Sequence, residues 1–239
     1  MSWIMSVVYD PFMARRETGN LGAWRAELLG DLEGTVLEIG AGTGANVPHY
    51  GRSVQRLLLT EPDRHMRQRL ADAWPRRQAA CPMHLLEAPA EDLSVETGSV
   101  DAVVATLVFC SVRSTARALR EVARVLRPGG RLVFLEHAEA ADGTWRRRWQ
   151  HLAEPLWRPV AGNCHLTRRP DVAIRAAGFD IEWMRWEEMQ HAGPLLSRCV
   201  RGVARKPAPS SERVDLAHAE AQWLKPAETD TGADGSASS

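Results

Sequence analysis

The sequence predicts an α/β fold in which a doubly wound, mostly parallel sheet carries helices on both faces. Short apolar runs rich in branched residues alternate along the chain with segments whose apolar residues follow the helical period. A glycine-rich loop, residues 40–44, directly follows one of these runs. With 239 residues, 44% of them hydrophobic, the chain is long enough to bury the core of one such domain.

Seven strands are expected, each a short apolar run bounded by turn residues. The first five alternate with helices, which implies parallel pairing with right-handed crossovers, and the last two are expected to close the sheet as a hairpin pair. The expected strands are 35–39, 56–60, 84–87, 100–106, 131–136, 179–186 and 196–204.

Helices are expected wherever apolar residues recur at helical spacing and a Gly or Pro follows. Gly30, Pro75, Pro128 and Gly178 serve as such stop signals. The expected helices are 2–30, one starting at about Ala45, 64–74, 115–126, 143–159 and 170–177.

Four parts of the chain differ in composition. Residues 1–33 are expected to form a helical lid that places Tyr9 and Phe12 over the substrate, and residues 34–206 the main domain. A Trp-rich insertion is expected at about 143–168, and the Ala-, Ser-, Asp- and Glu-rich tail 207–239 is expected to be disordered.

Bulk properties exclude several classes of protein. A formal net charge of zero gives no reason to expect nucleic-acid binding. The four cysteines lie far apart without a C-x-x-C pair, so no metal site is expected, and a reduced cytoplasmic chain is the default. Neither a signal peptide nor a membrane-spanning segment is recognisable.

The segment VLEIGAGTG predicts a nucleotide-type ligand. Gly40, Gly42 and Gly44 let the backbone approach a ligand closely. Their G-x-G-x-G spacing differs from the dinucleotide fingerprint, and the carboxylate of Glu38 opposes a pyrophosphate but favours a cation. S-adenosylmethionine (SAM), which joins a nucleoside to a positively charged amino acid, fits better than a dinucleotide.

Further acidic residues follow the second and third expected strands. Glu61 is placed to accept the ribose hydroxyls, with a surface glutamate as the alternative. Glu91 and Asp92 are placed to accept from the adenine amino group, and an equally acceptable interpretation is charge at a helix N-terminus.

Candidates for the acceptor side follow the fourth and fifth strands. Cys110 is either a nucleophile or, more simply, a small wall residue, since no histidine pairs with it in the sequence. His137 is either a general base or a hydrogen-bonded structural residue. Arg146, Arg147 and Arg148 form a solvated face or contact an anionic substrate or membrane.

Taken in order, these motifs resemble those of a known family. VLEIGAGTG, TEPD, APAEDL, VDAVVATLVFCSV and EVARVLRPGGRLVFLEH are similar to the motifs of class I SAM-dependent methyltransferases over about residues 35–137. TLVFCSV, LEHAEAADGTW, WQHLAEPLWRPVAGNCHLTR and a late GF segment resemble the methyltransferase-like 7 group of thiol S-methyltransferases, over about residues 34–206. The long apolar anchor at the start of the animal members is missing.

The resemblance implies a role for each matched residue. Residues on the donor side would hold SAM and its product S-adenosylhomocysteine, and residues of the distinctive insertion would wall the acceptor pocket, with Asp92, His137 and His165 as candidate bases. The implied cofactor-binding residues are Glu38, Gly40, Ala41, Gly42, Gly44, Asn46, Glu61, Pro62, Glu91, Asp92, Thr106 and Leu107, and the implied substrate-binding residues are Tyr9, Phe12, Cys110 and Cys164.

The predicted function is methylation of a small-molecule thiol. One alternative moves the methyl group to a nitrogen, oxygen or carbon of a phospholipid, quinone or natural product, with peripheral membrane contact suggested by the Trp- and Arg-rich helix. The other is a catalytically silent SAM-binding subunit. No nucleic acid or integral membrane partner is expected.

Overall fold

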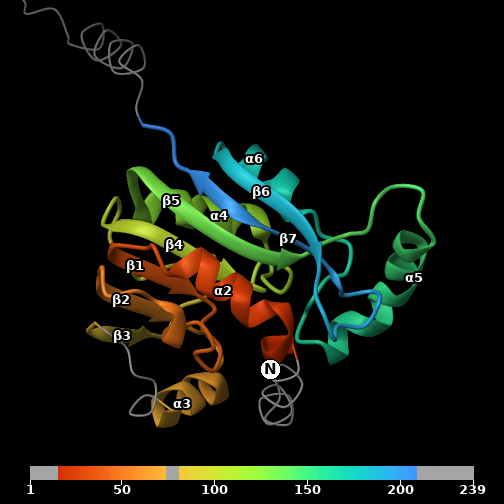
Figure 1. Cartoon of the computed structure of the whole chain (residues 1–239), viewed down its shortest axis with the longest axis horizontal. Coiled ribbons are helices and arrows are strands. Elements are labelled where there is room, and N and C mark those ends of the chain that lie inside the picture. The colour runs from red at the N-terminus through yellow and green to blue at the C-terminus, as the bar shows by residue number, and fades with distance from the viewer. Residues whose placement is uncertain (1–15, 74–80, 209–239) are drawn as a thin grey trace, which may run out of the picture. The chain divides into compact units, whose positions relative to one another are not determined.

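In the part of the chain that the structure describes, seven strands form one sheet in the order β3-β2-β1-β4-β5-β7-β6 (Figure 1). The computed structural model describes residues 16–73 and 81–208. Strands β1 to β5 pair in parallel, whereas β7 runs antiparallel to both β5 and β6. This confirms the predicted mostly parallel sheet. The strands are β1 (Gly34–Ile39), β2 (Val54–Thr60), β3 (Met83–Leu86), β4 (Val100–Thr106), β5 (Leu126–His137), β6 (Asp180–Glu188) and β7 (Arg198–Arg205).

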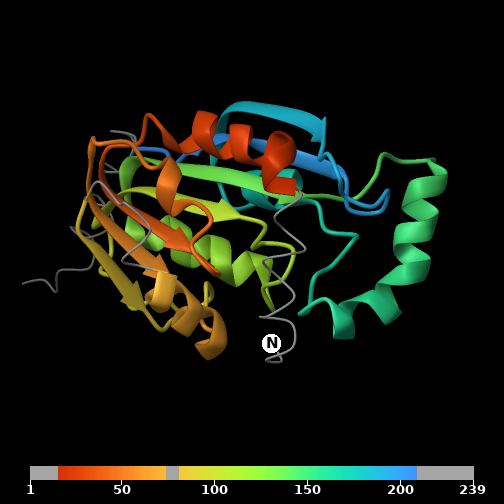
Figure 2. The same cartoon turned by 60° about the horizontal axis from the view of Figure 1, so that its bottom comes forward.

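Helices cover both faces of this sheet, as expected for a doubly wound fold. Helix α2 lies on one side and α4 on the other (Figure 2). The core on the α4 side also receives Ile174 of α6, and the core on the α2 side receives Leu70 of α3. The helical segments are the π-helical η1 (Glu17–Leu21), α2 (Gly22–Leu29), the 3₁₀ segment η2 (Val47–His49), α3 (Arg64–Ala73), α4 (Thr115–Val125), α5 (Trp145–Val160) and α6 (Pro170–Ala176).

Helix α4 shows why the sequence pattern predicted these elements well. The Ser114 side chain accepts the backbone N–H of Arg117 at 3.3 Å and caps the first turn. Ala118, Leu119 and Val122 are fully buried against the sheet. The apolar stripe at helical spacing therefore is the face that packs.

The prediction of a helix from about Ala45 is wrong, because only the short 3₁₀ segment η2 forms there. Pro48 stands in its first turn, and Tyr50 is already extended, with φ −73° and ψ 129°. The side chain of Asn46 bonds to residues on other elements instead of continuing a helix.

The N-terminal segment is described only from residue 16 onward. Within it, Leu21, Trp24 and Leu28 are buried against the sheet residues Val36 and Leu57. Residues 17–29 therefore form part of the sheet's covering layer. Tyr9 and Phe12 lie outside the described residues, as does the tail beyond residue 208, so the lid and the disordered tail stay predictions.

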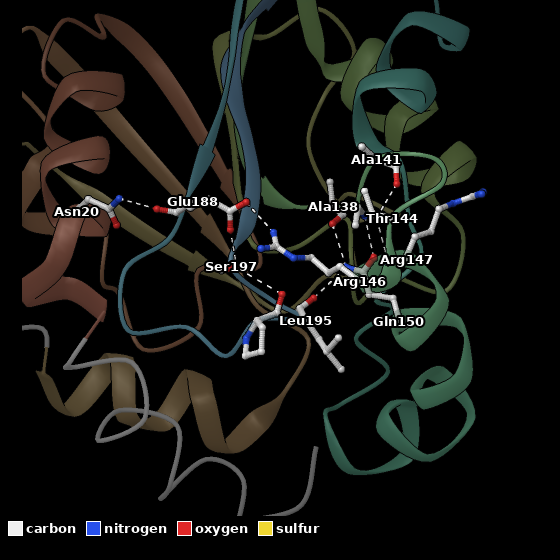
Figure 3. A network of polar contacts seen from close by, with 12 residues as sticks. Asn20, Ala138, Ala141, Thr144, Arg146, Arg147, Gln150, Glu188, Leu195 and Ser197 are labelled. Atoms are coloured by element: carbon white, nitrogen blue, oxygen red, sulfur yellow. Dashed lines mark hydrogen bonds and ion pairs between the residues drawn. The ribbon is translucent and has the colours of Figure 1, made fainter.

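Helix α5 is anchored through polar side chains (Figure 3). Gln150, its fully buried residue, accepts the N–H of Ala140 at 2.7 Å and donates to the carbonyl of Leu195 at 2.9 Å. Arg146 donates to Glu188 of β6 at 2.6 Å. These bonds fix the start of α5 against the end of the sheet.

The outer face of α5 is apolar. Its exposed large residues recur at helical spacing, so that the helix buries a glutamine and shows its apolar side outward. They are Trp145, Trp149, Leu152, Leu156 and Val160. In the described ranges of the chain, we find no helix with the length and apolar character needed to cross a membrane.

Candidate active site

The carboxyl ends of the parallel strands meet at one edge of the sheet. Ile39, the last residue of β1, pairs with Thr60 at the end of β2 and with Ala105 near the end of β4. Thr106 pairs in turn with Leu135 of β5. The segments that follow these strands therefore lie side by side, as the order of motifs along the sequence predicted.

The glycine loop after β1 needs glycine for two different reasons. Gly40, Gly42 and Gly44 all have positive φ, at 61°, 57° and 84°. A Cβ at Gly40 would lie 2.8 Å from Val108, and one at Gly44 would collide with Leu70. A Cβ at Gly42 would meet no heavy atom within 4 Å, so the loop leaves open space at this position.

Glu38 is buried beneath this loop within a hydrogen-bonded network. Its carboxylate accepts the Tyr50 hydroxyl at 2.7 Å and the Asn46 amide at 2.9 Å. The same amide donates to the Thr106 hydroxyl at 3.1 Å, and the Arg25 guanidinium donates to the Asn46 carbonyl. Burial raises the pKa of Glu38 to about 7, although these hydrogen bonds and the charge of Arg25 act in the opposite direction.

Glu61 lies directly after β2 and faces the glycine loop. Its carboxylate accepts the backbone N–H groups of Gly42 and Asp63, each at 2.9 Å. Burial raises the pKa of this carboxyl group, and the two hydrogen bonds counteract that rise. Next to it, Ala41 donates its N–H to Thr60 at 2.9 Å, and the carbonyl of Pro62 accepts from a guanidinium at 2.8 Å.

Glu91 and Asp92 lie on the loop after β3. The Glu91 carboxylate accepts the backbone N–H groups of Arg113 and Ser114 at 2.6 and 3.1 Å, just before α4 begins. Asp92 is exposed. The neighbouring Leu93 donates its N–H to Glu121 of α4 at 2.8 Å, which holds this loop against the helix.

The loop after β4 is wrapped around a buried carboxylate. Leu107 has a φ of 57°, and the next residues, Val108 and Phe109, donate their N–H groups to Glu136 at 2.8 and 2.9 Å. The N–H of Cys110 follows at 3.4 Å. Burial raises the pKa of Glu136 to about 7, against the effect of these hydrogen bonds. Glu136 thereby fixes the backbone that follows Thr106.

Two cysteines and a histidine converge behind this loop. The sulfur of Cys164 lies 2.9 Å from Nε2 of His137, and the ligand atoms of Cys110, His137 and Cys164 all lie within 4.8 Å of one another. The pKa of Cys164 is lowered by its contacts with Cys110 and His137, while the Cys164 contact and burial raise that of Cys110. Burial lowers the pKa of His137, but Cys164 outweighs it, so the pKa is raised.

The segment after α5 brings Cys164 to this place. Asn163 donates its amide to the carbonyl of Ser111 at 2.8 Å, and the N–H of His165 donates to the carbonyl of Cys110 at 2.8 Å. Arg168 donates to the carbonyl of Val112 at 2.6 Å. The insertion thus folds back over the loop that follows β4.

His165 is oriented by a carboxylate from α5. Its Nδ1 lies 2.7 Å from Glu154, whose other oxygen accepts the N–H of Leu166 at 2.6 Å. Burial lowers the pKa of His165, and the Glu154 carboxylate counteracts this effect. Engagement of Nδ1 leaves Nε2 for other partners.

Several residues of this site escaped the sequence analysis. Arg25 comes from a segment without a recognisable motif, Tyr50 follows the glycine loop without a predicted role, and the sequence marks Glu136 only as the end of a strand. Glu154 was one charged residue among many on a helix. The pairing of His137 with Cys164 joins residues 27 positions apart, which no spacing pattern indicated. Without a C-x-x-C pattern, the sequence also did not indicate that Cys110, His137 and Cys164 converge.

Comparison with known proteins agrees with this geometry. Residues 37–134 match a family model described as a methyltransferase domain. The fold is shared with a geranyl diphosphate methyltransferase in complex with SAM, which is 15% identical and superposes with a TM-score of 0.60 over 77% of this chain and 83% of that one. The methyltransferase domain, the sequence relatives and the fold together support a class I SAM-dependent methyltransferase.

Individual relatives point to narrower classes of methyl acceptor than the domain match does. The chain is similar to the human thiol S-methyltransferases TMT1B, with 40% identity over 60% of this chain, and TMT1A, with 38% over 61%. The match spans 59% of the length of each human protein. A malonyl-[acyl-carrier protein] O-methyltransferase of Methylococcus capsulatus is 31% identical over 73% of this chain and 62% of its own length.

Likeness of fold alone does not define the reaction. The [4+2]-cyclase SpnF, 21% identical, superposes with a TM-score of 0.58 over 79% of this chain and 80% of its own. The residues of the site give independent support for SAM as the cofactor. Open space at Gly42, the carboxylate of Glu61 beside it and the buried Glu38 below fit a nucleoside with a cationic tail.

Proposed function

We propose that this protein transfers a methyl group from SAM to a small-molecule thiol. The observation that carries the proposal is the 40% identity to a thiol S-methyltransferase. The oriented pair of His165 and Glu154 beside the loop after β4 supports it, because a thiol must lose its proton before its sulfur can attack.

On the donor side, the backbone of the glycine loop holds the methionine and ribose portions. Glu61 binds the ribose hydroxyls, and Glu38 attracts the methionine ammonium through Asn46 or water. Thr106 and Leu107 line the end that carries the methyl group. Glu91 and Asp92 flank the adenine, where the Glu91 carboxylate already fixes the start of α4 and Asp92 is exposed.

On the acceptor side, His165 takes the proton of the thiol. Bound SAM supplies a methyl group on a sulfonium, which is strongly activated, so the protein has to position the acceptor, exclude water and create a thiolate. A free thiol has a pKa near ~8.5, so a modest base is sufficient. Of the three candidate bases, His165 has the orienting carboxylate, whereas His137 is occupied by Cys164 and Asp92 is exposed.

The test is a panel of acceptors with the purified full chain and SAM, read by product mass. Alkyl and aryl thiols are expected to give S-methylated products together with S-adenosylhomocysteine. Methylation of amines, phenols or acyl carboxylates while every thiol remains unchanged would contradict the proposal. Binding of SAM without turnover of any acceptor would favour the catalytically silent subunit instead.

A second candidate is methylation of a lipid, favoured by the apolar outer face of α5. Its exposed side chains include Trp149 at 54% and Leu156 at 79% of full exposure, and Arg146, Arg147 and Arg148 lie on the same helix. Aromatic and basic residues on one helix are typical of helices that lie at a membrane surface. Co-sedimentation with vesicles containing anionic phospholipid, followed by product mass, tests it: binding and a methylated lipid are expected, and both should fall in Trp149→Ser/Leu156→Ser.

A further inference from the structure

Three side chains of the acceptor side form a set that the proposed base does not use. Cys110, on the loop after β4, and His137, the last residue of β5, are buried, at 4% and 5% exposure. Cys164 comes from the segment after α5. Their ligand atoms lie within 4.8 Å of one another, although 54 positions separate the two cysteines.

The geometry suits a small tetrahedral ion. Zinc binds thiolate sulfur at about 2.3 Å and imidazole nitrogen at about 2.0–2.1 Å, which places tetrahedral ligand atoms roughly 3.5–3.8 Å apart. The contact of 2.9 Å between His137 and Cys164 and the 4.8 Å limit for the whole set bracket these values. Side-chain movements of about 1 Å close the set around one ion.

The chemistry of the donors favours zinc over harder cations. Two thiolates and an imidazole suit zinc, whereas carboxylates and water suit magnesium or calcium. Nε2 of His137 lies 2.9 Å from the sulfur of Cys164, so this nitrogen faces the set and would be the one that binds the ion. Three protein ligands leave one position of a tetrahedron open, as in catalytic zinc sites.

One member of the set, Cys110, lies close to the residues proposed to line the methyl-donor end. The sulfur of Cys110 lies 3.4 Å from the carbonyl of Leu107, which adjoins Thr106. A cavity of about 50 Å³ is lined by Cys110, His137, Phe109 and Arg168, among others. It gives room for the sulfur of a small ligand beside the set.

We propose that Cys110, His137 and Cys164 bind one zinc ion whose fourth position takes the sulfur of the substrate thiol. This rests on the proposed function, since it assigns a way to activate that substrate. Loss of the thiol proton to His165 leaves an electron pair on the sulfur, which binds the ion as a thiolate. The thiolate then forms the new S–CH₃ bond, the methyl–sulfonium bond breaks with its electron pair staying on the cofactor sulfur, and the neutral thioether dissociates from zinc.

The first experiment measures zinc directly. The full chain is purified without a metal-binding tag, incubated with zinc chloride, dialysed and analysed by mass spectrometry of the metal. About one zinc per chain is expected, with affinity at least about tenfold weaker in Cys110→Ser and Cys164→Ser. The control is Cys81→Ser, a partly exposed cysteine outside the set, which should bind zinc normally. A wild-type chain that retains no zinc, or a Cys164→Ser chain that binds it equally well, overturns the proposal.

The second experiment tests the open position. Cobalt substituted for zinc reports its ligands, since each thiolate adds charge-transfer absorption in the near ultraviolet. Addition of 2-mercaptoethanol should increase that absorption in the wild type and in Cys81→Ser. An unchanged spectrum overturns the assignment of substrate to the ion. Circular dichroism and calorimetric binding of S-adenosylhomocysteine establish that each variant is folded.

Product mass measured in the same samples separates the two proposals. If a zinc-free chain methylates the thiol at the same rate as the zinc-loaded chain, thiol methylation is supported and the role of zinc is contradicted. If the chain binds zinc and the thiol but methylates only other acceptors, thiol methylation is contradicted while the zinc site is supported.

Discussion

The backbone N–H of Gly42 donates a hydrogen bond of 2.9 Å to the carboxylate of Glu61. This bond joins the glycine loop after β1 to the residue that follows β2. A carboxylate can accept further hydrogen bonds beyond the two it receives from the backbone. The arrangement therefore holds the Glu61 carboxylate in place while leaving it able to accept further hydrogen bonds, as its proposed role toward the ribose requires.

Replacement of this carboxylate should weaken cofactor binding. In Glu61→Gln one acceptor oxygen and the charge are lost, and hydrogen bonds to charged groups contribute about 1.5–3 kcal/mol. The dissociation constant of SAM should rise roughly 10- to 100-fold, measured by calorimetry. Glu87→Gln is the control, because Glu87 follows β3 but is exposed and pairs with Arg67 at 2.6 Å. Equal effects of the two substitutions would contradict the assigned role.

The buried Glu38 should make stability depend on pH. Its pKa in the folded protein, about 7, exceeds the ordinary 4.5, so the folded state holds a proton that the unfolded state releases in this window. The free energy of unfolding should fall as the pH rises from 4.5 to 7, by at most about 1.4 kcal/mol per unit for one such group. Arg25, Tyr50 and Glu61 set this pKa together with burial.

Glu38→Gln should remove that part of the slope. The measurement is urea unfolding of both proteins between pH 5 and 8. Glu136, whose pKa is also raised to about 7, contributes with the same sign and remains in both chains, so the difference between the two curves reports Glu38. Parallel curves would contradict the prediction.

Alanine substitutions at two glycines of the loop should affect stability and cofactor binding differently. Gly44→Ala forces a side chain into a φ of 84° against Leu70 and should destabilise the fold by roughly 2–4 kcal/mol. Gly42→Ala meets open space at a φ of 57° and should cost only about 1 kcal/mol, while its methyl group enters the space proposed for the cofactor. Urea unfolding and SAM calorimetry on both variants check this; a Gly42→Ala chain that binds normally would refute it.

The oriented imidazole should affect turnover rather than cofactor affinity. His165→Gln is expected to lower kcat for thiol methylation about 10²- to 10⁴-fold, and Glu154→Gln to lower it less, with SAM binding unchanged in both. His151→Gln provides the matched control, since His151 also pairs with a carboxylate, Glu139, at 2.6 Å. An unchanged kcat in His165→Gln would show that another group takes the proton of the thiol.

The sequence predicted elements whose signals are local. Strand β4 matched its expected bounds because a run of branched residues between turns indicates a buried parallel strand. The glycines of the loop were found because each needs a backbone conformation that other residues avoid. Both signals depend on a few consecutive residues.

Features that depend on distant partners were not predictable. The helix expected at Ala45 is absent because Asn46 bonds to Glu38 and Thr106, and only the folded chain brings these together. In the same way, the long excursion through α5 delivers Cys164 to His137. Local patterns contain no information on which segments return to each other.

The position of β7 has a consequence for how the chain is synthesised. As the last strand in sequence, β7 lies between β5 and β6 and pairs with both. A nascent chain that has reached residue 190 has already made β6 but has no neighbouring strand for it to join. Strands β1 to β5 can pair earlier, but completion of the sheet waits until residues 198–205 have left the ribosome, and the edge of β5 stays unpaired until then.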